Sequence, residues 1–275
     1  MKSEPFAYLP DQSEDLLIVS WMNAFPWLTV GFTTKLGGVS KGEYSSQNHG
    51  LHVGDENESV IQNRELLASR LSFSFEAWTS ANQIHGTNIY EVKSTDRGKG
   101  RDHLDTEIDK VDGLYTKQRD ILLASFYADC VPLFFLDPVK QLVGIAHAGW
   151  KGTAKQIGAE LIEAWVSEQG SKREDIQVAV GPAIGQCCYE VSEDVVTHFQ
   201  DFSSTHAIQE SDSFGKYRID LKQINVQFLL QAGILPKHIE VSSWCTSCNQ
   251  NLFFSHRRDQ GRTGRMVAFI AKKGE

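Results

Sequence analysis

The sequence lacks the features that membrane, secreted and nucleic-acid-binding proteins need. Its longest apolar run, residues 121–136, is interrupted by Asp129 and is too short to span a bilayer. Residues 1–17 carry acidic side chains where a signal peptide has an apolar core, so we expect a cytoplasmic protein without a membrane partner. The net charge is −8 and the largest basic group is the pair Arg257-Arg258, which argues against nucleic acid as a partner.

The chain also lacks internal repeats, low-complexity segments and linkers rich in proline, serine or charge. Its 275 residues, of which 41% are hydrophobic, are enough for one large core, so we expect one domain over residues 1–275. Predicted strands outnumber predicted helices, and several strands follow one another directly. This order predicts the α+β class with mixed sheets.

Local patterns predict the individual elements. Short apolar or β-branched segments bounded by turn residues predict strands at residues 16–20, 28–34, 77–83, 88–92, 111–116, 121–127, 131–136, 142–146, 176–180, 239–243, 252–255 and 266–271. Apolar residues at helical spacing predict helices at residues 57–71, from about 154 to 169, at 192–200 and at 221–232. Gly170 and Gly233 are expected to end two of these helices.

Two neighbouring strands each carry a reactive side chain at one end. Cys130 precedes the strand at 131–136, His147 follows the strand at 142–146, and Asp137-Pro138 between the strands predicts a tight turn. Such a hairpin brings the thiol and the imidazole to the same edge of a sheet. They are then either metal ligands or a nucleophile and its base. The alternative is a buried structural cysteine beside a hydrogen-bonded histidine.

His85 extends this pair, because it also lies at a predicted strand end and is followed by Gly86. Two histidines and one cysteine are the donor set of a catalytic zinc site, in which a fourth position stays open. Asp129 is next to Cys130 in the sequence; we expect a structural role for it, with proton transfer as the alternative.

Anion binding is expected close to His147. The glycine-rich turn at residues 149–152 leads into a helix, so its amides and the charge of Lys151 favour an anion there. Arg64 on the helix at 57–71 is a second candidate for phosphate, and Asn48 is a candidate for hydrogen bonds to ribose or base. The alternatives are an exposed lysine and, for Arg64, a solvated surface charge.

The pattern of the five cysteines argues against a disulfide framework, because their number is odd and two of them are adjacent. Cys245 and Cys248 have CxxC spacing, yet one such pair without a second pair is weak evidence for zinc. We expect a structural role for this CxxC pair, with metal or redox chemistry as the alternative, and the sequence assigns no role to Cys187 and Cys188.

Several motifs together resemble the laccase-domain family of bacterial proteins, which were first described as multicopper polyphenol oxidases and are now known as purine nucleoside phosphorylases. The matching pieces are GFTT at 31–34, GGVS at 37–40, Asn48, GLHVGD at 50–55, Asn63-Arg64, QIHG at 83–86, ADCVP at 128–132, HAGWKG at 147–152, GPAIGQCCYEV at 181–191, FFSHRRD at 253–259 and TGR at 263–265. Departures from the family pattern are Lys151 for the commoner arginine, His256 for tyrosine, and Gln47 and His49 beside Asn48.

The resemblance implies a zinc enzyme with His85, Cys130 and His147 as its ligands and catalytic residues. Cu²⁺ is a possible occupant of the same site in vitro, because it binds nitrogen and sulfur ligands more tightly than Zn²⁺ does. Its partners would be inorganic phosphate and purine nucleosides, namely adenosine, inosine, guanosine and methylthioadenosine, which it would cleave to base and pentose 1-phosphate. It would also deaminate adenosine. The implied fold is a sandwich of mixed β-sheets with flanking helices.

Three other functions compete with this one. A copper laccase needs many histidines in repeated His-X-His pairs, whereas this chain has nine histidines and no such pair, and none of its three methionines is near Cys130. A metal-free Cys–His hydrolase would use Cys130 as nucleophile and His147 as base but would leave His85 without a role. A metal carrier would bind zinc without turning over a nucleoside.

Overall fold

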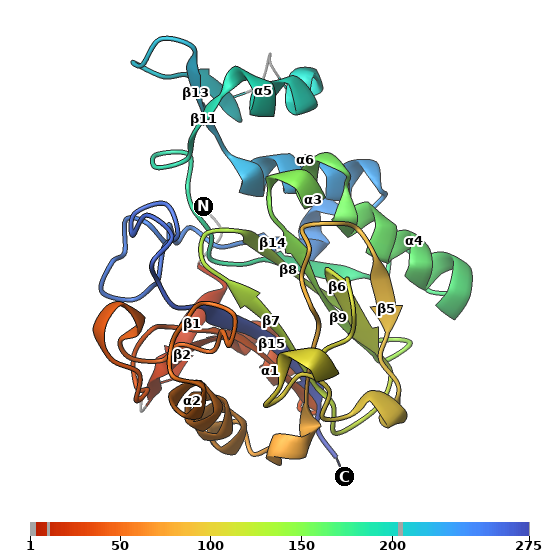
Figure 1. The fold of residues 1–275 in the computed structure, drawn as a ribbon. Coiled ribbons are helices and arrows are strands. Elements are labelled where there is room, and N and C mark those ends of the chain that lie inside the picture. The colour runs from red at the N-terminus through yellow and green to blue at the C-terminus, as the bar shows by residue number, and fades with distance from the viewer. Residues whose placement is uncertain (1–3, 10–11, 203–205, 275) are drawn as a thin grey trace.

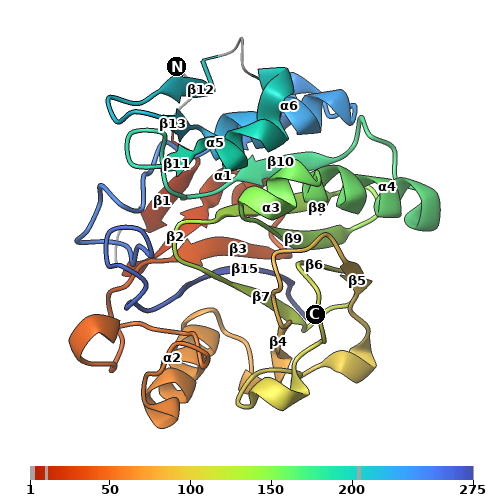
Figure 2. The same cartoon turned by 45° about the horizontal axis from the view of Figure 1, so that its top comes forward.

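The computed structural model describes residues 4–9, 12–202 and 206–274. Two six-stranded sheets pack face to face, and helices cover their outer faces (Figures 1 and 2). Both sheets are mixed. The α+β class, with mixed sheets in a sandwich and flanking helices, is therefore confirmed. Within the described residues, no helix is long and apolar enough to cross a membrane.

The first sheet has the strand order β1-β2-β3-β15-β7-β4. Only the pair of β4 and β7 is parallel in it. The short helix α1 (Val19–Ala24) connects two of its strands. The strand bounds are β1 (Phe6–Leu9), β2 (Gln12–Ile18), β3 (Leu28–Thr33), β15 (Met266–Lys272), β7 (Leu122–Tyr127) and β4 (Trp78–Ser80).

The second sheet has the strand order β14-β10-β8-β9-β6-β5 and carries the predicted Cys130–His147 hairpin. Two of its strand pairs, β10 with β14 and β5 with β6, are parallel. The strand bounds are β14 (Ile239–Val241), β10 (Gln177–Val180), β8 (Val131–Asp137), β9 (Leu142–Ala148), β6 (Gly113–Thr116) and β5 (Ile89–Glu91).

One core lies between the sheets, a second lies between the second sheet and its helices, and a third lies on the outer face of the first sheet. Strand β8 serves the first two: Phe134 and Leu136 point toward the first sheet, whereas Leu133 and Phe135 point toward the helices. Because both faces of these strands are covered, their sequences are continuous apolar runs without polar alternation.

Helices close the two outer faces. Helix α2 (Asn57–Arg70) covers the first sheet, and α3 (Trp150–Ala154), α4 (Ile157–Gln169) and α6 (Leu221–Gln231) cover the second (Figure 2). Helix α4 ends as predicted at Gly170, whose φ of +65° belongs to the left-handed region that glycine adopts without a steric penalty. Short 3₁₀ helices span Gly42–Tyr44, Phe75–Ala77, Ser94–Asp96, Leu104–Thr106, Thr197–Phe202 and Pro236–His238.

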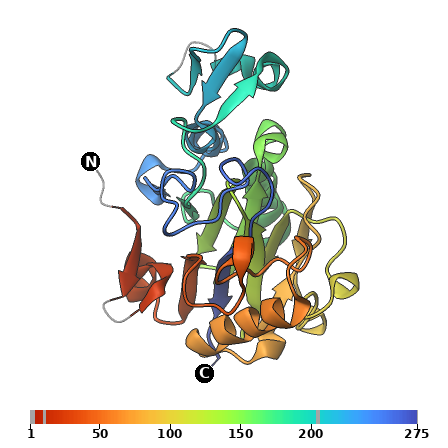
Figure 3. The same ribbon diagram turned by 60° about the vertical axis from the view of Figure 1, so that its left-hand side comes forward.

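A small third sheet projects from the sandwich (Figure 3). It consists of β11 (Glu190–Ser192), β13 (Lys216–Ile219) and β12 (Ile208–Glu210), next to helix α5 (Glu193–Val196). The sequence analysis did not predict these strands. The expected helix at 192–200 was only partly right, because α5 passes into a 3₁₀ helix at residue 197.

Two further expectations about strands were wrong. Residues 252–255 form a turn and an irregular segment, because Leu252 and Phe253 both donate backbone hydrogen bonds to the carbonyl of Asn249. Their apolar pattern reflects burial of Phe253 and Phe254 in the core between the two sheets. The strand expected at 16–20 instead begins at Gln12 and ends at Ile18, where α1 follows.

Candidate metal centre and substrate cavity

Strand pairing brings Cys130 and His147 together, as the hairpin predicted. In the antiparallel pair of β8 and β9, Pro132 lies opposite His147 and Val131 lies opposite Ala148. Cys130, directly before Val131, therefore reaches the same edge of the sheet as His147.

His85 reaches this edge from the loop between β4 and β5. Its φ is +59°, and the segment around it is held by the carboxylate of Asp112. Asp112 Oδ1 accepts from the amide of His85 at 3.0 Å, and Oδ2 accepts from the amides of Ile84 at 3.1 Å and Gly86 at 2.7 Å. One carboxylate thus shapes the whole turn that presents the His85 ring.

The same carboxylate orients His147. Asp112 Oδ1 lies 2.8 Å from His147 Nδ1, and both residues are only 3% exposed. A hydrogen bond at Nδ1 leaves Nε2 of His147 as the nitrogen available to a metal. The sequence analysis missed Asp112. Its signal was a carboxylate directly before the strand at Gly113, which pairs with the end of β9.

The three donor atoms converge closely. One donor atom each of His85, Cys130 and His147 lies within 4.8 Å of the others, and His85 Nε2 is 4.0 Å from Cys130 Sγ. Gly149 permits this approach, since a Cβ there would lie 3.0 Å from the His85 ring and 3.1 Å from Cys130 Sγ. Two imidazoles and one thiolate around one point fit a zinc ion with an open coordination position.

Electrostatics favour the thiolate form of Cys130. Burial opposes ionisation of the thiol, but the neighbouring His147 and His85 outweigh burial and lower its pKa to about 6. Burial also disfavours the charged form of His147, yet Cys130 and Asp112 raise its pKa to about 9. A thiolate is the form that binds a metal and also the form that acts as a nucleophile.

The three donors form part of the wall of a cavity of about 570 Å³, a size typical of small-molecule sites. Aromatic side chains lining the cavity include Phe126, Trp150 and Tyr189. Arg257 and Arg265 supply positive charge. The sequence analysis did not predict these lining residues as part of the site.

Two further titratable residues line the cavity with shifted pKa values. Burial lowers the pKa of His52 to about 4, with the positive charge of Arg265 contributing, so this imidazole is neutral at pH 7. Burial raises the pKa of Glu107 to about 7, although the charge of Arg64 opposes the shift. The cavity therefore contains a neutral imidazole and a carboxyl group that changes its charge near neutral pH.

Arg64 lies outside the lining of this cavity, and the alternative that it is a solvated surface charge was wrong. Its side chain is fully buried at 0% exposure. The guanidinium donates to the carbonyls of His49, Gly100 and Arg101 at 2.5–2.8 Å and lies over the ring of Phe126, a cavity-lining residue. These bonds give Arg64 a structural role behind the cavity wall.

Asn48 and Lys151 are also absent from the cavity lining. Asn48 is buried, donates to Asp55 at 2.9 Å and accepts from the amides of Gly50 and Arg265 at 2.9 and 2.8 Å. Lys151 is exposed on α3, with its ammonium group over the Trp150 ring. The structure thus brings together the three expected ligands but not the three expected substrate contacts.

Asp129 has the structural role that we expected. Its φ is +87°, and its carboxylate accepts hydrogen bonds from Thr246 Oγ1 at 2.6 Å, Ser255 Oγ at 2.9 Å and the Arg257 amide at 2.7 Å. These bonds tie the residue before Cys130 to the segment that carries Arg257 into the cavity.

Comparisons with known proteins give the family. The model of the family described as multi-copper polyphenol oxidoreductase laccase matches residues 29–273. The chain belongs to this family. The laccase-domain resemblance expected from the motifs is thereby confirmed.

Relatives in this family are similar over almost the whole chain. "Purine nucleoside phosphorylase YlmD" of Geobacillus stearothermophilus is 46% identical over 253 residues, which cover 91% of this chain and 92% of the relative. The protein of the same name from Bacillus subtilis is 44% identical over 88% of each chain. The crystal structure of YlmD from Geobacillus stearothermophilus superposes with a TM-score of 0.93 at 44% identity, covering 98% of this chain and 100% of that chain.

Proposed function

We propose that this laccase-domain protein is a metal-dependent purine nucleoside phosphorylase, which cleaves a purine nucleoside with inorganic phosphate to the base and pentose 1-phosphate. The observation that carries the proposal is the convergence of His85, Cys130 and His147 in a cavity with two arginines and several aromatic rings. The names of the similar Geobacillus and Bacillus proteins support the same reaction. The proposed catalytic unit is one domain over residues 1–275.

The metal that we propose is zinc, held by His85, Cys130 and His147. The donor set fits it, because mixed nitrogen and thiolate ligands with a free position are typical of catalytic zinc. A bound zinc ion supplies Lewis acidity, which stabilises negative charge as it develops on the substrates. Cu²⁺ is expected to occupy the same donors in vitro, since it binds nitrogen and sulfur ligands more tightly than Zn²⁺ does.

The protein's own side chains have separate tasks in this proposal. The rings of Tyr189 and Trp150 provide apolar faces for the purine, and Arg257 and Arg265 provide charge for phosphate. Protonated Glu107 donates a hydrogen bond to the departing base, because its raised pKa keeps the proton available near neutral pH. Substrate contacts at the buried Asn48 and Arg64 would need rearrangement of the present geometry, and the exposed Lys151 lies outside the cavity lining.

The finer substrate range is also part of the proposal. It comprises adenosine, inosine, guanosine and methylthioadenosine, together with deamination of adenosine at the same metal centre. Deamination at C6 needs a water molecule that a metal activates, as in other zinc deaminases. A single centre for both reactions predicts that they are lost together when a ligand is removed.

One other function has an observation in its favour. Asp112, His147 and Cys130 are arranged like the acid, base and nucleophile of a metal-free cysteine hydrolase. That function leaves the approach of His85 to Cys130 without a purpose. A copper laccase has less support because it needs many histidine ligands. Within the described residues, His85 and His147 are the only histidines that belong to a potential metal-binding group.

Anaerobic incubation with adenosine, with and without phosphate, tests the proposal. We expect adenine and ribose 1-phosphate only when phosphate is present. Deamination should occur in both cases and yield inosine without phosphate, and inosine together with its cleavage product hypoxanthine when phosphate is present. His85→Ala should abolish both reactions, whereas His103→Ala, an exposed histidine outside the cavity lining, should leave both intact. Absence of phosphorolysis by metal-loaded protein, or a strict need for oxygen, would contradict the proposed function.

A further inference from the structure

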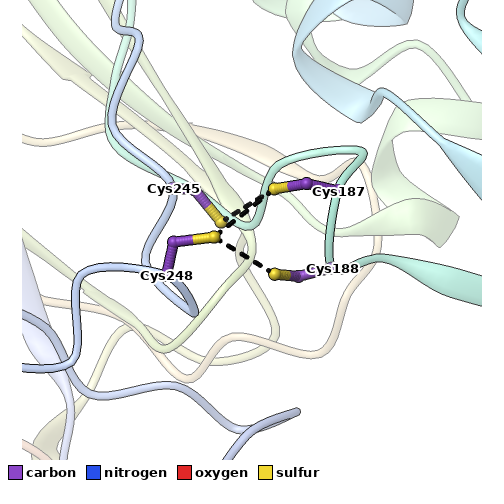
Figure 4. A group of neighbouring side chains, drawn as sticks. All are labelled: Cys187, Cys188, Cys245 and Cys248. Carbon is purple, nitrogen blue, oxygen red and sulfur yellow. Dashed lines mark hydrogen bonds between the residues drawn. The ribbon is translucent and has the colours of Figure 1, made fainter.

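Two loops that are far apart in the sequence place four cysteines around one point (Figure 4). Cys187 and Cys188 lie in the loop after β10, and Cys245 and Cys248 lie in the loop after β14. The two strands are parallel neighbours, and a bridge between Ala183 and Cys245 extends their pairing into the loops. The adjacent cysteines thus supply the second pair of thiols that the CxxC spacing lacked.

The distances between the sulfur atoms match a single shared centre. All four lie within 4.8 Å of one another. Cys248 Sγ is 3.5 Å from Cys187 Sγ and 3.4 Å from Cys188 Sγ, and Cys187 Sγ is 3.7 Å from Cys245 Sγ. A tetrahedral zinc ion with Zn–S bonds of about 2.3 Å holds its sulfurs about 3.8 Å apart.

Pairing into disulfides fits this arrangement less well. Two disulfides would separate the thiols into two pairs with S–S bonds of about 2.05 Å. Cys248 Sγ instead lies at nearly equal distances from the sulfurs of Cys187 and Cys188, and Cys187 is also close to Cys245. Each sulfur therefore belongs to one group of four.

The surroundings compensate the charge of such a group. Zinc with four thiolates has a net charge of about −2, which hydrogen-bond donors and nearby cations stabilise. The amide of Gly185 donates to Cys245 Sγ at 3.1 Å. The Arg218 guanidinium bonds the carbonyl of Cys187 at 3.0 Å, and buried Lys222 bonds the carbonyl of Trp244, next to Cys245, at 3.1 Å.

We propose that Cys187, Cys188, Cys245 and Cys248 bind one zinc ion in a structural site separate from the His–Cys–His centre. The ion would fasten the loop after β10 to the loop after β14. Both loops support the cavity, because Tyr189 lines it and Thr246 holds the carboxylate of Asp129 beside Cys130. The projecting third sheet begins at Glu190, so the ion would also anchor the base of that sheet.

Substitution of the two exposed cysteines tests the proposed zinc site without changing the packing of the core. Cys187 and Cys248 are exposed, so serine at both positions requires no repacking. Ser247→Ala is the matched control, since Ser247 lies between the two CxxC cysteines. We expect the full-length Cys187→Ser/Cys248→Ser double variant to contain one zinc ion per chain fewer than the Ser247→Ala variant. This difference is independent of whether the His–Cys–His centre also holds metal.

Cobalt substitution and thermal melting add two readouts. Co²⁺-loaded control protein should show strong thiolate-to-cobalt charge transfer, of which the double variant loses most and Cys130→Ala only a small part. With Cys130→Ala present in both proteins, chelation should lower the melting temperature of the Ser247→Ala control but not of the double variant. Equal zinc content in the double variant and the control would overturn the proposal. Recovery of the four cysteines as disulfides from freshly isolated control protein would overturn it as well.

Discussion

Replacement of Asp112 by asparagine tests the contribution of this carboxylate to metal affinity separately from its contribution to stability. Asparagine has almost the same shape as aspartate but only one acceptor oxygen. In the wild type, the amides of Ile84 and Gly86 donate to Asp112 Oδ2 at 3.1 and 2.7 Å. In the variant, the single oxygen accepts from His147 and the amide of His85, so the NH₂ group faces the amides of Ile84 and Gly86. Two donors thereby lose their acceptor.

The structure gives two magnitudes for this substitution. Each lost acceptor costs about 1–3 kcal/mol, and we take the lower end, about 2 kcal/mol in total, because these amides are only partly buried. That loss corresponds to a fall in Tm of roughly 4–8 °C for a protein of this size. Loss of a carboxylate partner of a ligating histidine weakens metal binding by about 10–100-fold, or about 1.4–2.7 kcal/mol.

Competition with a chelator of known affinity measures the metal affinity, and thermal melting of metal-free protein measures stability. Asp129→Asn is the matched control, because this buried carboxylate is next to Cys130 but bonds Thr246, Ser255 and the Arg257 amide. We expect the control to lose stability and keep its metal affinity. Unchanged metal affinity in Asp112→Asn, or an equal loss in both variants, would refute the role assigned to Asp112.

Four other substitutions test the cavity and its support. Arg257→Ala should raise KM for phosphate about 10-fold or more through loss of a charge-assisted hydrogen bond, whereas Lys151→Ala should leave it nearly unchanged; the reverse order would favour Lys151 as the phosphate contact. The proton on Glu107, with a pKa of about 7, is lost as pH rises, so kcat/KM should fall above pH 7, and Glu107→Gln should remove that limb of the profile. If kcat/KM of Glu107→Gln still falls above pH 7, the titrating group is not Glu107. Arg64→Met should lower the free energy of unfolding by about 3–5 kcal/mol, because three carbonyls lose their buried donor, and should leave zinc content unchanged; a denaturation midpoint equal to that of the wild type would contradict the structural role.

The convergence of Cys130 and His147, two of the proposed metal ligands, was predictable from the sequence because local order fixes their positions. Cys130 and His147 lie at the two ends of one hairpin, and the turn between its strands is marked by Asp137-Pro138. Asp112 was not predictable in the same way, since its bonds to His147 and the His85 loop join segments that only the folded sheet brings together. The four-cysteine group was not predictable for the same reason, because its two cysteine pairs are brought together only by the pairing of β10 with β14.

Polar residues on buried helix faces were the other source of error. Helix α2 was predicted from its apolar residues, but its buried face also carries Asn63 and Arg64, which hold loop carbonyls. A polar side chain satisfied by distant backbone groups leaves no periodic signal in the sequence. Leu66, one of the apolar residues of this helix, is 37% exposed.

The central claim is that a metal ion at His85, Cys130 and His147 is needed for nucleoside cleavage. The most direct measurement is the rate of anaerobic inosine phosphorolysis by metal-free Cys187→Ser/Cys248→Ser protein as zinc is added back. We predict no turnover without metal and full turnover at one zinc ion per chain. Full turnover by the metal-free protein would contradict the claim and would favour Cys130 and His147 as a nucleophile and base.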